Sequence, residues 1–307
     1  HNNFNFSLIT ICCICTALTN INACIFKGNK KPSSFAAFSG LVSLTCVILL
    51  LLLLKVHSAQ QALISLTVAL SISLSLSFII LYRLFPKQKS PCSFKKKGNF
   101  TSSAFSFWVA AIVFFVIQQG STLLLSLHAN LQQLGVLFIT IKLASIPSII
   151  LFAFNSVLAP KFAIYYQKSQ HKLLNTYFKQ SQRLLSLAAI MLALIYATFG
   201  RDILNLFGSN FETGYIWLCI LIIGQSVNLI TGPAITLLAM SGNEYLHRNI
   251  SILTGALTVT IGIFAIPKYG ALGAAVTTAV AIVLQNTISY FYVIRRVLNK
   301  HHDLSSI

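Results

Sequence analysis

Nine apolar segments, each long enough to cross a lipid bilayer, constrain this chain more than any other feature of its sequence. A helix needs about 20 mostly apolar residues to span a hydrocarbon core about 30 Å thick. Only 8% of the residues are charged, too few for the surface of a soluble domain, where about a quarter would be charged. The segments run approximately over 5–26, 36–55, 62–84, 104–127, 133–158, 182–199, 214–240, 249–266 and 271–294.

The third segment alternates serines with apolar residues from Ser71 to Ser77, a period that also fits a membrane β-strand. A β-barrel would need such alternation over about 10 residues in every crossing. The run from Ile48 to Leu54 is instead continuously apolar. We therefore predict an all-α polytopic membrane protein with about nine transmembrane helices.

Positive charge collects in alternate loops. The chain has 22 Lys and Arg residues against 4 Asp and Glu, a net charge of +18. The loops that follow the first, third, fifth, seventh and ninth segments hold 18 of these 22, whereas the other loops hold only Lys55, Arg201 and Lys268. Basic loops of membrane proteins stay in the cytoplasm. The pattern therefore predicts a multi-pass protein with a cytoplasmic C-terminus, and it excludes nucleic acid as the partner.

Two connections suggest how the chain is organised. We expect three helices in residues 1–84, a basic linker at 85–103, a six-helix bundle at 104–298 and a cytoplasmic tail at 299–307. Within the bundle, residues 161–181 place aromatic and aliphatic residues on one helical face and lysines off it. This spacing predicts an amphipathic helix in the cytoplasmic interface, with an ordinary loop helix as the alternative. Nine crossings put the first residue on the outer face, and three further helices upstream would make twelve.

Residues that carry enzyme or ion-coupling chemistry are missing from the predicted membrane segments. Asp202, Glu212, Glu244 and Asp303 all fall in predicted loops or the tail, whereas ion-coupled pumps usually hold a carboxylate inside the membrane. The sequence contains no P-loop and no HExxH motif, and its 7 cysteines have no partner histidine at metal-ligand spacing. We therefore expect a protein that is not an enzyme and that uses neither a metal nor a cofactor.

Lys142 is the one charge that falls well inside a predicted membrane segment, away from its ends. It lies roughly 14 Å from the outer end of the fifth segment at 1.5 Å per residue. A charge at helix centre costs about 2.5–3.5 kcal/mol on insertion scales, so it usually faces a polar cavity or a partner. Without a carboxylate in the membrane, an anionic substrate is the natural counter-ion. A lysine that snorkels to the membrane surface is the alternative reading.

Several amides also lie within the predicted membrane segments. Amides commonly hydrogen-bond between helices, and as a set they predict a partly polar interior of the kind that a sugar-accepting cavity needs. Gly232-Pro233 interrupts the seventh segment, and Pro147 lies close to Lys142. Such breaks bend a helix or let its backbone line a cavity. The candidate substrate-binding residues are Lys142, Gln118, Gln119, Asn155, Gln225 and Asn228.

Four stretches carry a resemblance to a known family. They are LASIPSIILFAFNSVLAPKFA at 143–163, FGRDILNLFGSNFE at 199–212, GQSVNLITGPAITLLAMSGNEY at 224–245 and IPKYGALGAAVTTAVAIVLQN at 266–286. In this order they resemble the polysaccharide-transporter branch of the multidrug/oligosaccharidyl-lipid/polysaccharide exporter superfamily, and within it bacterial O-antigen and related oligosaccharide flippases. The resemblance covers residues 100–295, and it extends to 1–99 by helix pattern only.

The resemblance implies twelve helices in two six-helix bundles around a central cavity, of which this chain would be helices four to twelve. It also implies that the protein flips undecaprenyl-diphosphate-linked oligosaccharide across the bacterial inner membrane by alternating access, for O-antigen or other surface polysaccharide synthesis. Lys142 would face the diphosphate or an acidic sugar. The expected partners are the lipid-linked oligosaccharide, membrane lipids and other proteins of polysaccharide assembly.

Two alternatives stay open from the sequence. A drug or cation antiporter of the same superfamily predicts an Asp or Glu inside the membrane. An integral membrane enzyme of polysaccharide assembly predicts a sizeable outer loop or a His/Asp pair near the membrane.

Overall fold

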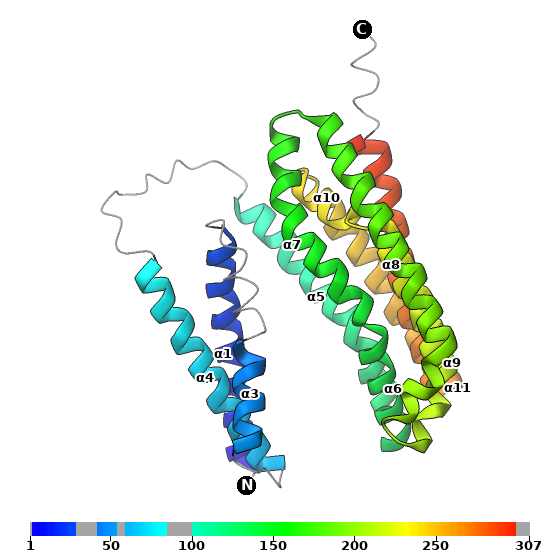
Figure 1. The fold of residues 1–307 in the computed structure, drawn as a ribbon. Coiled ribbons are helices and arrows are strands. Elements are labelled where there is room, and N and C mark those ends of the chain that lie inside the picture. Colours follow the sequence, from blue (N-terminus) through cyan, green and yellow to red (C-terminus); the bar gives the residue numbers. More distant parts are fainter. Residues whose placement is uncertain (1, 29–41, 54–58, 85–99, 299–307) are drawn as a thin grey trace. The chain divides into compact units, whose positions relative to one another are not determined.

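The structure, a computed structural model, describes residues 2–28, 42–53, 59–84 and 100–298. The chain divides into two compact units, His1–Lys95 and Lys96–Ile307, and each is described by itself. Apart from short turns the described residues are helical (Figure 1), which confirms the all-α prediction. The division falls within the predicted linker 85–103. Most of that linker, and the whole predicted tail, lie outside the described residues.

The first unit consists of α1 (Asn2–Gly28), α3 (Val42–Leu53) and α4 (Ala59–Leu84). Polar side chains join α1 to α4 inside this unit. Cys12 Sγ lies 3.3 Å from Thr67 Oγ1. Asn22 donates a hydrogen bond to Ser77 Oγ at 2.9 Å. Both pairs are 55 residues apart in sequence, so α1 and α4 run in the same direction, as two crossings separated by a third must. The polar face of α4 is thus an interhelical contact, a common role for small polar residues in membranes.

The second unit begins with α5 (Phe100–Ser126), α6 (Leu131–Ala144) and α7 (Ile146–Gln167). It continues with α8 (His171–Asn205), the 3₁₀ turn η2 (Ser209–Gly214) and α9 (Tyr215–Thr231). It ends with α10 (Ala234–Met240), α11 (Glu244–Tyr292) and the π-helical turn η3 (Val293–Leu298).

Two membrane crossings of this unit are broken into two helical pieces. α6 and α7 are separated at Ser145, and Pro147 lies in the first turn of α7, where the missing N–H breaks no helical hydrogen bond. α9 and α10 are separated by Gly232-Pro233. Gly232 has φ 63°, a conformation that glycine adopts most readily. Both interruptions agree with the positions indicated by the sequence.

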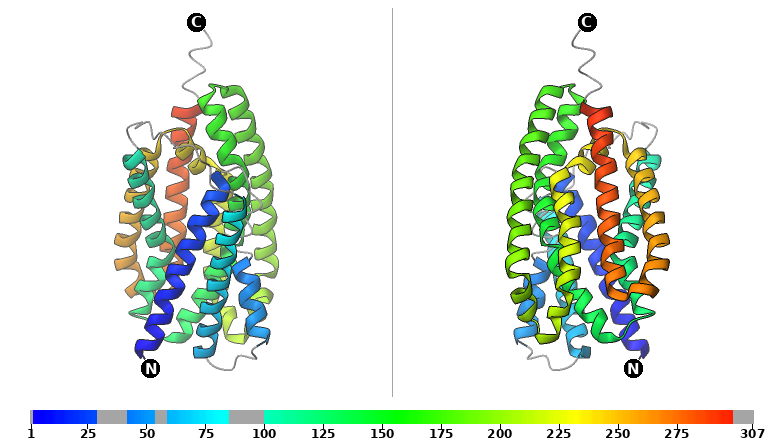
Figure 2. Two further views of the ribbon diagram at one scale, coloured as in Figure 1. Left: turned by 90° about the vertical axis from the view of Figure 1, so that its left-hand side faces the viewer. Right: turned by 90° about the vertical axis from the view of Figure 1, so that its right-hand side faces the viewer.

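α11 is a hairpin of two antiparallel arms that meet at Gly270, where φ is 56° and ψ is −131°. Gln285 Nε2 donates to Ser251 Oγ at 3.2 Å, which joins the two arms. Near the turn, a Cβ added to Gly273 would lie 2.4 Å from the carbonyl oxygen of Ala265. Figure 2 shows the arms side by side in orange and red. The arms correspond to the crossings predicted at 249–266 and 271–294.

The described helices account for the nine predicted crossings. Seven helical stretches are long and apolar enough to span a membrane. One of them, Glu244–Leu298, contains the hairpin and therefore supplies two crossings. α3 supplies the ninth with 12 described residues, and the rest of its predicted segment lies outside the described part.

The relative direction of consecutive helices in the second unit agrees with this number of crossings. Gln182 Nε2 on α8 donates to the carbonyl oxygen of Ile230 near the end of α9, at 3.1 Å. Tyr215, at the start of α9, donates its hydroxyl hydrogen to the carbonyl oxygen of Ala197, further along α8, at 3.0 Å. Residues late in one helix thus meet residues early in the next. α8 and α9 are therefore antiparallel, as consecutive crossings must be.

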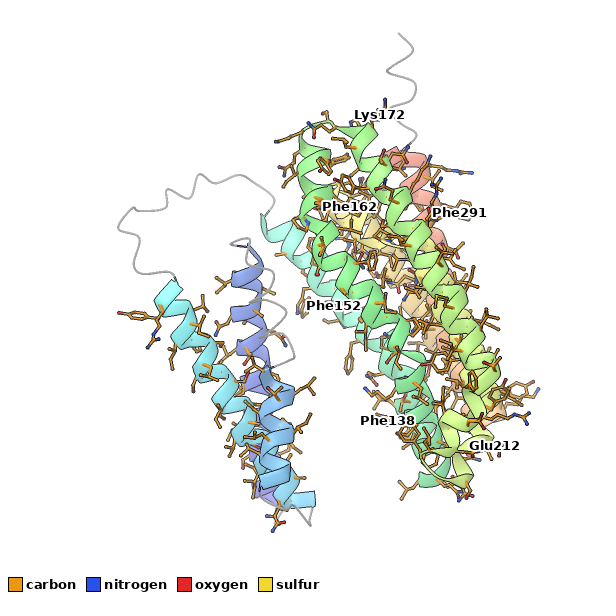
Figure 3. All side chains as sticks on the ribbon, in the orientation of Figure 1. Phe138, Phe152, Phe162, Lys172, Glu212 and Phe291 are labelled. Atoms are coloured by element: carbon orange, nitrogen blue, oxygen red, sulfur yellow. The ribbon has the colours of Figure 1, made fainter. Side chains whose placement is uncertain are left out.

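Basic residues gather at one end of the second unit. Figure 3 shows Lys172 and Phe162 toward that end, and Glu212 and Phe138 toward the other. The end with Lys172 has a core that joins α7, α8, α10, both arms of α11 and η3. Its basic residues include Lys161, Lys168, Lys172, Arg248, Arg295 and Arg296, whereas the opposite end carries Arg201 and Lys268. The structure therefore brings alternate basic loops together, and which side of the membrane each end faces stays a prediction.

The single amphipathic helix predicted over 161–181 does not form, so this prediction was wrong. A turn at 168–170 separates the end of α7 from the start of α8. The aromatic stripe packs these two helix ends together: Tyr165 and Tyr177 stack with their ring centroids 5.4 Å apart, and Phe162 is buried. A helical hairpin and one continuous helix share the same apolar spacing, which is why the sequence pattern did not distinguish them.

The close contact of the hairpin arms makes a testable prediction about Gly273. Gly273→Ala should lower the melting temperature of the purified protein in detergent, because its Cβ would meet the backbone of Ala265, and overpacking of this kind costs about 1–3 kcal/mol. The matched control is Gly135→Ala on α6, where nothing lies within 4 Å of the added Cβ. Equal melting temperatures for the two variants would contradict the hairpin packing.

Candidate functional site

A cavity of about 450 Å³ lies inside the second unit, within the size range of small-molecule sites. α5, α7, α9, α10 and both arms of α11 contribute to its wall (Figure 1). Gly232, at the break between α9 and α10, is part of the lining. The polar lining residues are Gln118, Ser148, Asn155, Gln225, Asn228, Thr236, His247, Gln285 and Asn286.

Gln225 lies at the centre of the polar contacts on the α7 and α9 side. Its Oε1 atom accepts a hydrogen bond from Ser148 Oγ at 2.7 Å and another from Asn228 Nδ2 at 3.1 Å. The Gln225 side chain is 5% exposed, so these two bonds replace the water it would otherwise bind. A buried polar group left without a partner would cost about 1–3 kcal/mol. The network therefore fixes α7 against α9 at the cavity wall.

Another part of the wall is formed by amides of the second arm of α11. Gln285 donates to Ser251 on the first arm, and Asn286 donates to the carbonyl oxygen of Ile282 at 2.8 Å. Both amides are buried. Each donates from its amide nitrogen, and each amide also has an oxygen with acceptor capacity.

Two buried atoms of the cavity lining have no hydrogen-bond partner among the residues that the structure describes: Asn155 Oδ1 and His247 Nδ1. Such atoms are rare because they lose their hydration without replacement. In a cavity they are the positions where a bound solute gains most by supplying the missing hydrogen bond.

Aromatic rings complete the lining beside these polar groups. Phe107 and Phe114 come from α5, and Phe152 comes from α7. Phe152, labelled in Figure 3, lies about midway along the unit. An apolar wall with a few fixed polar groups is the usual composition of a site for an amphiphilic ligand.

The break between α9 and α10 is supported from outside the cavity. The carbonyl oxygen of Ile230 belongs to the last turn of α9, where carbonyls lack intrahelical partners. Gln182 Nε2 donates to this oxygen and lies 3.1 Å from Tyr290 Oη on α11. One side chain on α8 thus links the broken crossing to α11.

Four of the six residues predicted for substrate binding line this cavity: Gln118, Asn155, Gln225 and Asn228. Gln119 is not among its lining residues. Lys142 lies in the last turn of α6 and is exposed, with Nζ 5.2 Å from the centre of the Phe138 ring. Contact between Lys142 and a substrate stays a prediction.

The polar lining residues outside the predicted set are His247, Ser148, Thr236, Gln285 and Asn286. Of these, His247 is the one that the sequence reasoning placed in a loop. The eighth segment was expected to begin at residue 249, which left His247 in a loop. In the structure α11 begins at Glu244, after a turn in which Gly242 has φ 73°. The Gly242-Asn243 pair is a turn signal, and reading it as the helix boundary would have placed His247 in the first turn of the helix.

The lining is nearly neutral. Among the described lining residues there is no Asp, Glu, Lys or Arg, and His247 is the one residue that can change its charge near neutral pH. Most charged residues of the second unit instead lie toward its two ends, and at one of them Arg201 and Glu212 form an exposed ion pair at 3.9 Å. The cavity is thus suited to a polar ligand that brings its own hydrogen-bonding groups.

Comparisons with known proteins relate this chain to transporters by fold. No protein-family profile and no curated protein sequence matches it. Among solved structures, it is similar to an outward-facing multidrug resistance MATE family transporter of the MOP superfamily, with a TM-score of 0.63 and 11% identity over 92% of this chain and 67% of that chain. It is also similar to a point mutant of a MATE protein, with a TM-score of 0.64 and 11% identity over 94% of this chain and 67% of that chain. The chain therefore has the fold of a MATE transporter over about two thirds of the length of these structures.

The hydrogen bonds of the cavity predict opposite effects for two substitutions. Gln225→Ala should lower the melting temperature, because Ser148 and Asn228 lose a shared acceptor. Asn155→Ala should leave the melting temperature unchanged or raise it, because it removes a buried oxygen that has no partner. Thermal unfolding of both variants in the same detergent is the measurement. A larger loss for Asn155→Ala than for Gln225→Ala would contradict the assignment of these contacts.

Proposed function

We propose that the chain moves a polar, amphiphilic solute across a membrane by alternating access, with the cavity of the second unit as a solute site. The observation that carries the proposal is the cavity itself, in which amides and aromatic rings from separate crossings surround one space. The fold shared with multidrug transporter structures supports the same class of function. The break at Gly232-Pro233 beside the cavity supplies a point where one wall can bend.

For the solute, the site chemistry favours a lipid-linked oligosaccharide, carried for surface polysaccharide synthesis. Amide side chains both donate and accept hydrogen bonds, which matches the hydroxyl groups of sugars. No carboxylate among the described lining residues repels a diphosphate. The basic end of the second unit attracts a phosphate group toward the cavity. On this proposal the protein acts in the bacterial inner membrane, with the basic end facing the cytoplasm.

A drug or cation antiporter is the second candidate, and the comparisons favour it over the oligosaccharide branch, because the similar structures belong to the MATE family. Against it stands the nearly neutral lining, since ion-coupled exchange usually uses a carboxylate inside the membrane. None lies among the described lining residues. The two candidates therefore differ in the charge of the solute, which makes them separable by experiment.

Expression in two bacterial hosts distinguishes the candidates. One host lacks its own oligosaccharide flippase, and the other lacks its drug efflux pumps. We expect the 307-residue chain to restore surface polysaccharide in the first host and to leave the drug sensitivity of the second unchanged. Drug resistance without restored polysaccharide would contradict the oligosaccharide proposal and support the antiporter.

Adjacent glutamines test whether the cavity is the solute site. Gln118→Ala should lower surface polysaccharide by about tenfold, the effect of losing one hydrogen bond worth about 1.4 kcal/mol. Gln119→Ala, one residue further along α5 and outside the lining, is its matched partner. Equal losses would argue against the cavity as the solute site.

Lys142→Ala tests the remaining sequence-based prediction. Loss of surface polysaccharide at an unchanged protein level would support a contact between Lys142 and a phosphate group, and unchanged polysaccharide would exclude this contact.

A further inference from the structure

His247 is the one lining residue, among those the structure describes, that carries an imidazole, the side chain whose unperturbed pKa lies closest to neutral pH. It lies in the first turn of α11, at the end of the second unit where the basic residues gather. Its buried Nδ1 atom has no hydrogen-bond partner within the described part of the chain. Because the other lining side chains are uncharged, the protonation of this imidazole sets the net charge of the cavity wall.

The charged groups around the start of α11 are mostly basic. α11 itself carries Glu244 and Arg248, and Arg248 Nη1 lies 3.4 Å from Ser106 Oγ on α5. On η3, Arg295 and Arg296 are basic, and Arg296 Nη1 lies 3.4 Å from Tyr245 Oη. The described residues of α5, α9 and α10 include no charged side chain. The basic ends of α7 and α8, with Lys161 and Lys172, share the core at this end.

We propose that His247 is the proton-binding group of the cavity, and that its imidazolium form binds the phosphate group of the solute. The inference rests on the proposed transport of a phosphate-bearing solute, and it adds the group that links this transport to protons. A proton from water adds to the free ring nitrogen, which gives the wall one positive charge. Loss of that proton to water on the other side of the membrane removes the charge and releases the anion.

The sign of the linkage follows from Coulomb attraction. An anion binds the protonated cavity more tightly, so its affinity is high at low pH and falls as the imidazole loses its proton. A cationic solute would show the reverse, because the protonated ring repels it. The attraction between the imidazolium and a phosphate is strong where water is excluded and is weakened by screening. We expect a change in affinity of about tenfold.

Binding of a sugar diphosphate across pH tests this inference. UDP-N-acetylglucosamine is the probe, because both of its phosphates are esterified and keep their charge from pH 5.5 to pH 8. Isothermal titration calorimetry on the 307-residue chain in detergent should show an affinity that falls about tenfold over this range. His247→Gln should bind weakly with no pH dependence, and His247→Arg should bind tightly with none, because its charge is fixed.

His128→Gln is the matched control, because His128 is exposed, lies outside the lining and should leave the pH dependence unchanged. Size-exclusion profiles show which variants are folded, and one folded His247 variant is enough for the binding test. The inference is overturned if the wild-type affinity does not fall with pH, or if the pH dependence persists without His247. If this inference fails while the polysaccharide assay succeeds, the transport proposal is still supported.

Discussion

Every backbone polar group in hydrocarbon must find its partner within the protein, and the rest of this structure depends on that requirement. An unsatisfied N–H or C=O costs several kcal/mol in lipid, so crossings are helical and interruptions occur where protein surrounds them. The interruption at Gly232-Pro233 follows this rule. Gly232 lines the cavity, and the nearby carbonyl of Ile230 receives a hydrogen bond from Gln182 on α8. The break is therefore both supported by the bundle and placed beside the candidate site.

The same cost explains where polar side chains are found. Charged residues of the second unit lie mostly toward its ends, whereas the cavity between them is lined by amides, hydroxyls, aromatic rings and one histidine. Gln225 and Gln285 use part of their hydrogen-bonding capacity to join helices. Asn155 and His247 each keep a buried atom without a partner. A site built from neutral amides favours a ligand that is rich in hydroxyls, and its charge preference then depends on the single imidazole.

Segment length and charge alternation were sufficient to predict the all-helical fold and its nine crossings, because both reflect the thickness and polarity of a bilayer. The hairpin at Gly270 could be predicted because an apolar run of that length exceeds one crossing. Within residues 161–181 the turn at 168–170 could not be predicted, because a three-residue turn leaves the helical spacing of the apolar residues unchanged. Of the site residues, four amides were found because amides are conspicuous in apolar segments, whereas Gln285 and Asn286 were not in the predicted set. His247 was missed because its position depends on where α11 begins, and helix boundaries are weakly encoded.

The central claim is that the cavity of the second unit receives the solute. The most direct test is protection of Asn228→Cys, in a variant whose native cysteines are replaced, from a water-soluble maleimide. UDP-N-acetylglucosamine should slow modification at position 228 several-fold and leave modification of His128→Cys, outside the lining, unchanged. Equal modification rates at position 228 with and without a saturating concentration of the sugar diphosphate would contradict the claim.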